Sequence, residues 1–322
     1  MKAMNENFEM RDFGTYSPEE IIAENLQELF ERADVLGEEE IAHLCELAAE
    51  IAQGDDLADL LSSLPYYRIS EMKPLAGALA DHKELLSRSR KLLEARQCMI
   101  LCRALYEKLK HRENLLSALF PDVEEVLPQA AGRIVYQRSS YANDAYLAFA
   151  SLLPNARATY AHSFAAACEE VYNGHCEYCI LPVENAVEGE LIGFAKLIAQ
   201  FDLKIIAVCD IAGADASRST RFALLQRNML PLSDADAMKN GCFRFSLSKE
   251  SASLVADVLT AANFYGLKLR SANTLPPSEQ SLFNLTFDIC GGDLYPFLLY
   301  LATVAPQYTP IGIYSHIKQK GI

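Results

Sequence analysis

The spacing of hydrophobic and polar positions changes twice along the chain and divides it into three regions. Over residues 17–127, apolar residues recur every three to four positions, as in EEEIAHLCELAAEIA, which predicts helices. Over residues 133–226, short apolar runs such as RIVYQ, RATYA and LKIIAVCDI alternate with helical segments, which is typical of parallel βαβ units. From residue 241 the predicted order is strand, helix, strand, strand, helix, strand, the ferredoxin-like order.

These patterns predict a multidomain fold that is partly α/β and partly α+β. We expect an all-helical domain over residues 1–130, a parallel α/β lobe over residues 131–230 and a βαββαβ domain over residues 240–322. A chain of 322 residues, of which 51% are hydrophobic, has ample material for packed cores.

Composition narrows the classes of partner. A formal net charge of −14 argues against nucleic acid, since phosphate binding needs a basic face. No apolar run reaches the roughly 18 residues of a membrane span, and the N-terminus shows no signal-peptide core, so we expect no membrane partner and a cytoplasmic location. The nine cysteines lack framework spacing and are predicted to be reduced thiols.

The stretch CILPVENAVEGELIGF, residues 179–194, is the first candidate site. An apolar run ends at Pro182 and is followed by Glu184 and Asn185, which indicates a core strand that opens into a loop. In open α/β sheets, ligands bind at the carboxyl ends of the strands. The neighbouring HCEYC lacks the four ligands of structural zinc, so we predict no metal, no cofactor and a core position for Cys179.

The run SFAAACEEVYNGHCEYCILPVENAVEG, residues 163–189, resembles the prephenate dehydratase family. RIVYQ and the Ser-Thr-Arg-Phe of residues 219–222 follow in the family's order, and the βαββαβ segment resembles the ACT domain behind the dehydratase. The resemblance covers roughly residues 132–318 and implies a lobe like that of periplasmic binding proteins. It also implies that the protein is linked to phenylalanine biosynthesis.

The family chemistry implies roles for single residues. Prephenate carries two carboxylates and loses CO2 and hydroxide together, so its site needs anion-holding groups and an acid. By resemblance, Thr220 is the candidate catalytic residue at the leaving hydroxyl, and Arg221 is a carboxylate clamp. Substrate binding would also fall to Glu184, Asn185 and Phe222, with Glu184 organising the loop. Without the resemblance, the same Thr-Arg-Phe triplet is an ordinary strand with a solvated arginine.

Three departures from the family argue against dehydratase turnover. Ala186 stands where the family has serine, and RSSYAND has no glycine at the expected glycine-rich turn. Only the eight residues 212–219 lie between two strands that the family separates by a complete second lobe. A single lobe cannot enclose its substrate and exclude water, unless a second subunit supplies the missing wall.

The ACT-like segment departs in a parallel way. The family's Gly-Ala-Leu effector loop falls on ASL at residues 252–254, and its Glu-Ser-Arg-Pro falls on NTLP at residues 273–276, which puts phenylalanine sensing in doubt. The side-by-side pairing of such domains predicts a homodimer through residues 241–318. The candidate effector-binding residues are Ala252, Ser253, Leu254, Asn273 and Thr274.

The run LLEARQCMILCRALYEKLKHRENLLSALF, residues 92–120, distantly resembles a chorismate mutase helix. Arg96, Arg103 and Lys110 recur every seven residues, and Arg112-Glu113 matches that family's Arg-Glu pair. The linker between the first two mutase helices is missing, so we interpret the cations as a solvated helix face.

The functional prediction is a degenerate member of the prephenate dehydratase family, a non-catalytic regulator or a protein that binds a small aromatic carboxylate or amino acid. The alternative is an active dehydratase completed across a dimer, or chorismate mutase activity in the helical region. If the site still binds a ligand, Glu184 and Asn185 should lie beside Thr220 and Arg221 at the edge of a sheet. If it does not, Glu184 should be turned inward to cap backbone groups or to pair with Arg221.

Overall fold

The structure is a computed structural model, and it describes most of the chain from residue 38 onward. The predicted helix PEEIIAENLQELFERA, the Arg112-Glu113 pair and Leu275-Pro276 lie outside the described residues. The described ranges are 38–53, 60, 83–111, 115–120, 132–153, 155–213, 219–229, 240–274 and 282–317.

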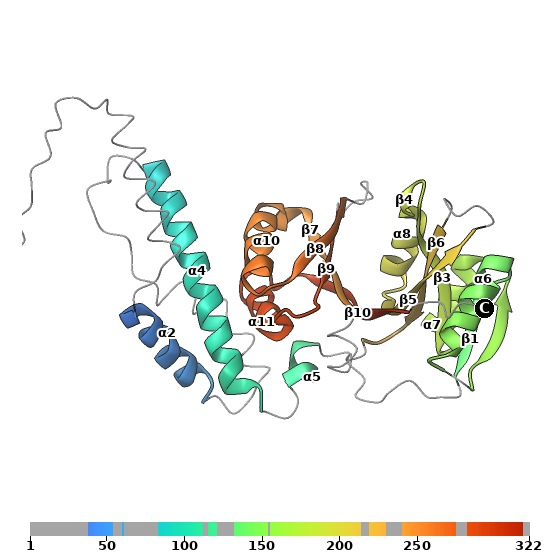
Figure 1. Cartoon of the computed structure of the whole chain (residues 1–322), viewed down its shortest axis with the longest axis horizontal. Coiled ribbons are helices and arrows are strands. Elements are labelled where there is room, and N and C mark those ends of the chain that lie inside the picture. Colours follow the sequence, from blue (N-terminus) through green and yellow to red (C-terminus); the bar gives the residue numbers. More distant parts are fainter. Residues whose placement is uncertain are drawn as a thin grey trace, which may run out of the picture.

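A single ten-stranded mixed sheet runs through both β-containing regions, in the order β2-β1-β3-β6-β5-β10-β7-β9-β8, with β4 paired to β3 (Figure 1). The first six strands belong to residues 132–229, which we call the lobe. The other four belong to residues 240–317, which we call the C-terminal module. The strands are β1 Arg133–Gln137, β2 Arg157–Ala161, β3 Tyr178–Asn185, β4 Gly189–Glu190, β5 Lys204–Ala212, β6 Ser219–Gln226, β7 Gly241–Ser248, β8 Lys268–Thr274, β9 Leu282–Asp288 and β10 Thr309–Ile317.

The lobe is a sheet covered on both faces by helices, as the alternating pattern predicted. β1 pairs in parallel with β2 and β3. β6 runs antiparallel to both β3 and β5, because the short connection after β5 is too short for a parallel crossover. One face packs on α6 (Ser140–Ala150), and the other face packs on α7 (Phe164–Tyr172) and α8 (Ile192–Gln200).

The C-terminal module has the predicted βαββαβ order. Helices α10 (Val255–Phe264) and α11 (Leu294–Val304) cover one face of its sheet, and a short 3₁₀ helix, η2 (Lys249–Leu254), precedes α10. β7 reads GCFRFSLS, and its alternation turns Phe243 and Phe245 towards the helices. Cys242, Arg244 and Ser246 therefore occupy the opposite side, which we call the open face.

The lobe and the module meet where β10 pairs in parallel with β5, Ser315 opposite Ala207 and Ile317 opposite Cys209. Gly312 lies close to β5, because a Cβ built there would come within 2.3 Å of the carbonyl oxygen of Ile205. A side chain would therefore hold the two strands apart. The glycine permits the close approach that makes the sheet continuous.

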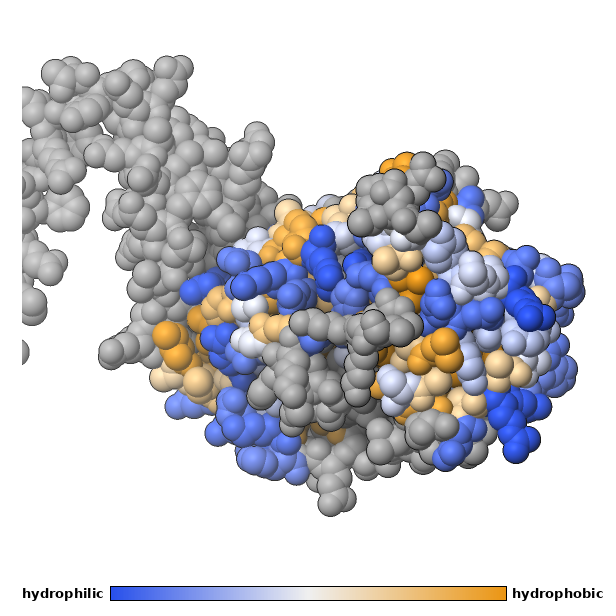
Figure 2. Space-filling model, turned by 45° about the vertical axis from the view of Figure 1, so that its right-hand side comes forward, coloured by the Kyte–Doolittle hydropathy of each residue, from blue (hydrophilic) through white to orange (hydrophobic). Residues whose placement is uncertain are grey.

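The N-terminal helices pack on the outside of the module. Helix α4 (Lys83–Leu109) lies against α11 and α10 and carries α2 (Glu38–Ile51) on its other side (Figure 1), and a short α5 (Leu115–Leu119) also contacts α11. In the part of the chain that the structure describes, no helix is long and apolar enough to cross a membrane. The face in Figure 2 mixes hydrophilic and hydrophobic residues, as protein surfaces do.

Two of the three evenly spaced cations, Arg96 and Arg103, contribute to this helix packing, whereas Lys110 follows α4 and pairs with Glu107. The guanidinium carbon atoms of Arg96 and Arg103 lie 4.4 and 4.6 Å from the ring centroid of Phe264, at the end of α10. Arg103 also forms an ion pair of 3.2 Å with Asp293, just before α11. Cation–π contacts of this kind tie α4 to the module. The interpretation of these two arginines as a solvated face is therefore corrected, since both engage the module.

Candidate functional site

The candidate site begins where the buried strand β3 reaches the edge of the sheet. Its first six residues are buried, as the continuous apolar run predicted, and its last two are partly exposed. The side chain of Asn185 accepts hydrogen bonds from the backbone N–H groups of Val187 and Glu188, at 2.9 and 2.6 Å. Asn185 thereby shapes the turn into β4, a turn that Gly189 completes with φ of 71°.

The sheet brings the two polar pairs of the sequence analysis together. In the register between β3 and β6, Glu184 lies opposite Arg221 and Asn185 lies opposite Thr220. β6 is inserted between β3 and β5, so Arg221 also lies opposite Asp210 of β5. This neighbour was missed, although β5 and β6 are consecutive strands joined by a short connection, an arrangement that favours a hairpin.

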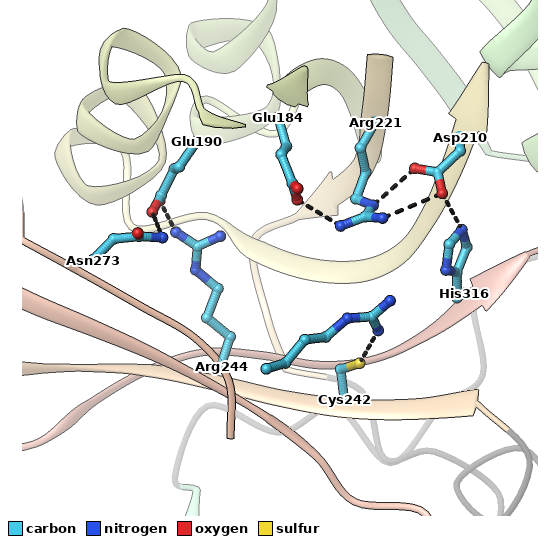
Figure 3. A network of polar contacts seen from close by, with 9 residues as sticks. Glu184, Glu190, Asp210, Arg221, Cys242, Arg244, Asn273 and His316 are labelled. Atoms are coloured by element: carbon cyan, nitrogen blue, oxygen red, sulfur yellow. Dashed lines mark hydrogen bonds and ion pairs between the residues drawn. The ribbon is translucent and has the colours of Figure 1, made fainter. Parts of the chain in front are cut away.

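Arg221 holds two carboxylates of the protein (Figure 3). Its Nε and Nη2 donate to the two oxygens of Asp210 at 2.8 and 3.2 Å, a bidentate contact, and its Nη1 donates to Glu184 at 2.5 Å. Nε2 of His316, from β10, lies 3.0 Å from Asp210. The hydrogen bond from His316, aided by Arg221, holds the pKa of Asp210 well below its usual range. Asp210 is therefore ionised at neutral pH and neutralises Arg221.

Thr220 and Phe222 lie on the other face of the strand. Phe222 is 4% exposed and packs in the core beneath α6, so the structure places it away from any ligand on the side of Arg221. Thr220 lies two residues before Phe222 on β6, so its side chain points to the same face of the sheet. The candidate catalytic hydroxyl and the candidate clamp Arg221 therefore point to opposite faces.

A cavity of about 360 Å³ lies beside Arg221, between the lobe and the open face of the module. Its volume falls in the range of small-molecule sites. The lobe provides one wall of the cavity and the module provides the facing wall. The module therefore covers a surface of the lobe that would face solvent if the lobe were alone. The lining residues are Val183, Glu184, Gly189, Glu190, Ile205, Val208, Arg221, Arg244, Arg270, Ser271, Asn273, Thr286 and Tyr314.

A second ion pair crosses this cavity and joins its two walls. Arg244 of β7 pairs with Glu190 of β4, whose side chain is only 9% exposed. Asn273 of β8 donates to the same carboxylate at 2.6 Å (Figure 3). Burial makes such a pair sensitive to the loss of one partner, so Glu190 links the β3–β4 turn to the module.

The candidate effector residues lie in separate elements. Ser253 and Leu254, with Ala252, belong to η2, whereas Asn273 and Thr274 end β8. Asn273 is bonded to Glu190 of the lobe rather than directed to η2. Their role in effector binding stays a prediction.

Sequence reasoning missed Asp210, Glu190, Arg244, Arg270 and Tyr314. One signal was available for Arg244, because in FRFSLS a charged residue between two phenylalanines must lie on the face away from the core. The pattern does not tell which element that face meets.

The cysteines of HCEYC are both buried, and Cys179 is fully enclosed in the core, as predicted. Among the described residues, no group of three or more His, Cys, Asp or Glu side chains is placed to hold a metal ion.

The comparison with known protein families finds a match in the part of the chain that includes β3. Residues 136–212 match the family model described as prephenate dehydratase. This segment of the chain is similar to prephenate dehydratase. This segment runs from Tyr136 in β1 to Ala212 at the end of β5. The resemblance is confirmed for this segment.

Solved structures resemble the chain over about half its length. Prephenate dehydratase from Streptococcus mutans is 18% identical with a TM-score of 0.47, and the match covers 57% of this chain and 98% of that chain. The Arthrobacter aurescens enzyme in complex with L-Phe is 14% identical with a TM-score of 0.46, covering 57% of this chain and 90% of that one. GqqA, described as a quorum quenching acylase, is 18% identical with a TM-score of 0.43, covering 57% and 94%. No curated protein sequence matches the chain.

Proposed function

We propose that the protein is a non-catalytic relative of prephenate dehydratase that binds a small aromatic carboxylate or amino acid and acts as a regulator in the cytoplasm. One observation carries the proposal. The arginine that the resemblance assigns to a substrate carboxylate, Arg221, already donates three hydrogen bonds to Glu184 and Asp210. A substrate carboxylate would have to compete with these two protein carboxylates for the same donors.

The path of the chain supports the same proposal. β5 is followed directly by β6, and the two pair along their whole length from Lys204 opposite Gln226 to Ala212 opposite Ser219. This arrangement leaves no room in the chain for a second lobe between them. The module, and not a second lobe, faces Arg221 across the cavity, and Thr220 points away from Arg221, so the candidate acid and the candidate clamp do not converge on one ligand position.

The test is incubation of the purified protein with prephenate and with chorismate. We expect no loss of either compound and no phenylpyruvate beyond the spontaneous reaction, because the clamp is occupied and the candidate acid faces elsewhere. An active prephenate dehydratase under the same conditions is the positive control. Phenylpyruvate formed at an enzymatic rate would favour a dehydratase completed across a dimer, and consumption of chorismate would favour a mutase in the helical region.

Calorimetric titration with phenylalanine, prephenate and phenylpyruvate tests the binding half of the proposal. At least one of these ligands should bind to the wild-type protein. If none of them binds at millimolar concentration, the aromatic-ligand function is wrong.

We also infer that the module forms a homodimer through β8. Its other edge strand, β10, is covered by β5 within the same chain, whereas β8 pairs, among the strands that the structure describes, with β9 alone and has a largely exposed burial pattern. An open edge of this kind commonly pairs with a second copy. Light scattering at micromolar concentration should give the mass of a dimer, and Leu269→Glu, which places a charge on the edge, should shift the mass towards that of a monomer. A monomeric wild type would contradict the inference.

A further inference from the structure

Three arginines from three strands line the cavity between the lobe and the module: Arg221 of β6, Arg244 of β7 and Arg270 of β8. Two carboxylates, Glu184 and Glu190, are in the same lining. Asp210, behind Arg221, is a third carboxylate close to this cavity. The three arginines differ in what already holds them.

Two of the arginines are bound to carboxylates of the protein. Arg221 donates to Glu184 and Asp210, and Arg244 pairs with Glu190. The pair of Arg244 with Glu190 is buried, with side-chain exposures of 12% and 9%, so a ligand that took Arg244 would leave a buried carboxylate unpaired, which is costly. Arg221 is 24% exposed and is shared by two partly exposed carboxylates, with which a ligand would have to compete.

Arg270 is held differently. Its Nη1 donates to the sulfur of Cys242 at 3.0 Å, and among the described residues no carboxylate lies within 4.0 Å of its guanidinium. A thiol is a weak hydrogen-bond acceptor. Burial raises the pKa of Cys242, so the thiol is neutral at pH 7 and does not compensate the charge of Arg270. The nearby Asp288 accepts instead from the backbone N–H of Cys290, at 2.9 Å.

The rest of the lining suits an apolar body. Val183, Ile205 and Val208 belong to the buried side chains on one face of the lobe's sheet, and Tyr314 adds a ring that is only 6% exposed. Burial raises the pKa of Tyr314 to about 12, so its hydroxyl keeps its proton at neutral pH and can donate a hydrogen bond. The cavity thus combines an apolar wall with one arginine, Arg270, that forms no ion pair with a carboxylate among the described residues.

We propose that Arg270, contributed by the C-terminal module, is the carboxylate-binding residue of this cavity, and that the cavity takes a small monocarboxylate with an apolar body. Arg221 and Arg244 then hold the walls together through their protein carboxylates. A guanidinium fork binds a carboxylate with two parallel hydrogen bonds. The proposal deepens the ligand-binding part of the proposed function, because it names the residue and the ligand class.

The test uses two acids and an amine with the full-length protein. We would titrate 3-phenylpropanoate, hexanoate and phenylethylamine into wild type, Arg270→Ala, Arg270→Lys and Lys268→Ala by calorimetry. Lys268 lies on the same strand and carries the same charge, but it lines a neighbouring cavity and not this one. It therefore controls for general electrostatic attraction.

Both acids should bind to the wild type, and the amine should not. Arg270→Ala should weaken the acids at least about ten-fold, since a charge-assisted hydrogen bond is lost, and Arg270→Lys should give an intermediate affinity. Lys268→Ala should bind like the wild type. Because Arg270 lies on an exposed strand, the unfolding temperature of the variants should stay close to that of the wild type.

Two outcomes would overturn the proposal: no binding of either acid to the wild type, or equal binding by wild type and Arg270→Ala. If phenylalanine, prephenate or phenylpyruvate still bound in those cases, the proposed function would stand and its ligand would lie elsewhere. If hexanoate bound through Arg270 while no aromatic ligand bound, the site would stand and the aromatic function would fail.

Discussion

Replacement of Gly312 by alanine is expected to lower the free energy of unfolding by about 1–3 kcal/mol or more, the cost of overpacking a closely fitted site. The added Cβ would meet the backbone of Ile205 at 2.3 Å from its carbonyl oxygen and 3.0 Å from its nitrogen. Backbone atoms cannot rotate away as the end of a side chain can. β10 and β5 would have to separate, and the hydrogen bonds that join lobe and module would weaken. Denaturant unfolding, followed by circular dichroism, measures the change.

Gly193→Ala is the matched control, because a Cβ built there meets nothing within 4 Å and Gly193 lies inside α8. Alanine is the better helix former, so this variant should be unchanged or slightly more stable. The two glycines together separate a steric effect at the junction from a general effect of glycine replacement. Equal stability of Gly312→Ala and wild type would show that the β5–β10 contact can relax at little cost.

The Gly312 variant also bears on the candidate site, because the cavity has one wall in each half of the sheet. Arg221 and Glu184 lie in the lobe, whereas Arg244, Arg270 and Tyr314 lie in the module. A shift of β10 against β5 moves these groups relative to one another. Ligand affinity should therefore fall in Gly312→Ala even under conditions where the protein stays folded.

The local pattern of the sequence was sufficient for most elements of the fold. The unbroken apolar run before Glu184 predicted a buried strand, and β3 is one because both of its faces are covered by helices. The βαββαβ order could be predicted in the same way, because the hydrophobic residues of each helix and strand recur with the period of that element.

What the sequence did not reveal depends on pairing between distant segments. Arg244 and Glu190 are 54 residues apart on β7 and β4, whereas Arg221 and Asp210 are only 11 residues apart on the consecutive strands β6 and β5. No short-range pattern records that β6 lies between β3 and β5, or that β10 lies beside β5. The resemblance led to Arg221 because it is in a motif, whereas Arg270 is a single cation on an edge strand and carries no such signal.

The boundary between the N-terminal helices and the module also depends on contacts between distant segments. The sequence predicted a separate helical domain over residues 1–130, but in the structure α2 and α4 share one hydrophobic cluster with α10, α11, β7 and β9. The hydroxyl of Tyr265, after α10, donates to the backbone carbonyl of Met99 in α4 at 2.7 Å. Tyr106 of α4 stacks on Tyr295 of α11, with ring centroids 5.5 Å apart. Shared packing of this extent favours one cooperative unit.

Leu105→Ala tests this expectation directly. Leu105 lies in α4, is fully buried and belongs to the shared cluster, so its truncation should cost about 2–5 kcal/mol through lost burial and the cavity left behind. If α4 and the module unfold together, the module should be destabilised as much as the helix. Native-state hydrogen exchange can measure this, because the amides of β9 should exchange faster by the factor that the loss of stability predicts.

Leu147→Ala is the control, since Leu147 lies on α6 of the lobe and its side chain is 64% exposed. Its replacement should change stability by no more than about 0.5 kcal/mol and leave β9 untouched. A different result for Leu105→Ala would contradict the expectation of one cooperative unit. If α4 lost its protection while exchange in β9 stayed at the wild-type rate, the helices would unfold on their own. Residues 1–130 would then be the independent domain that the sequence predicted, and Arg96 and Arg103 would contribute only a weak surface contact.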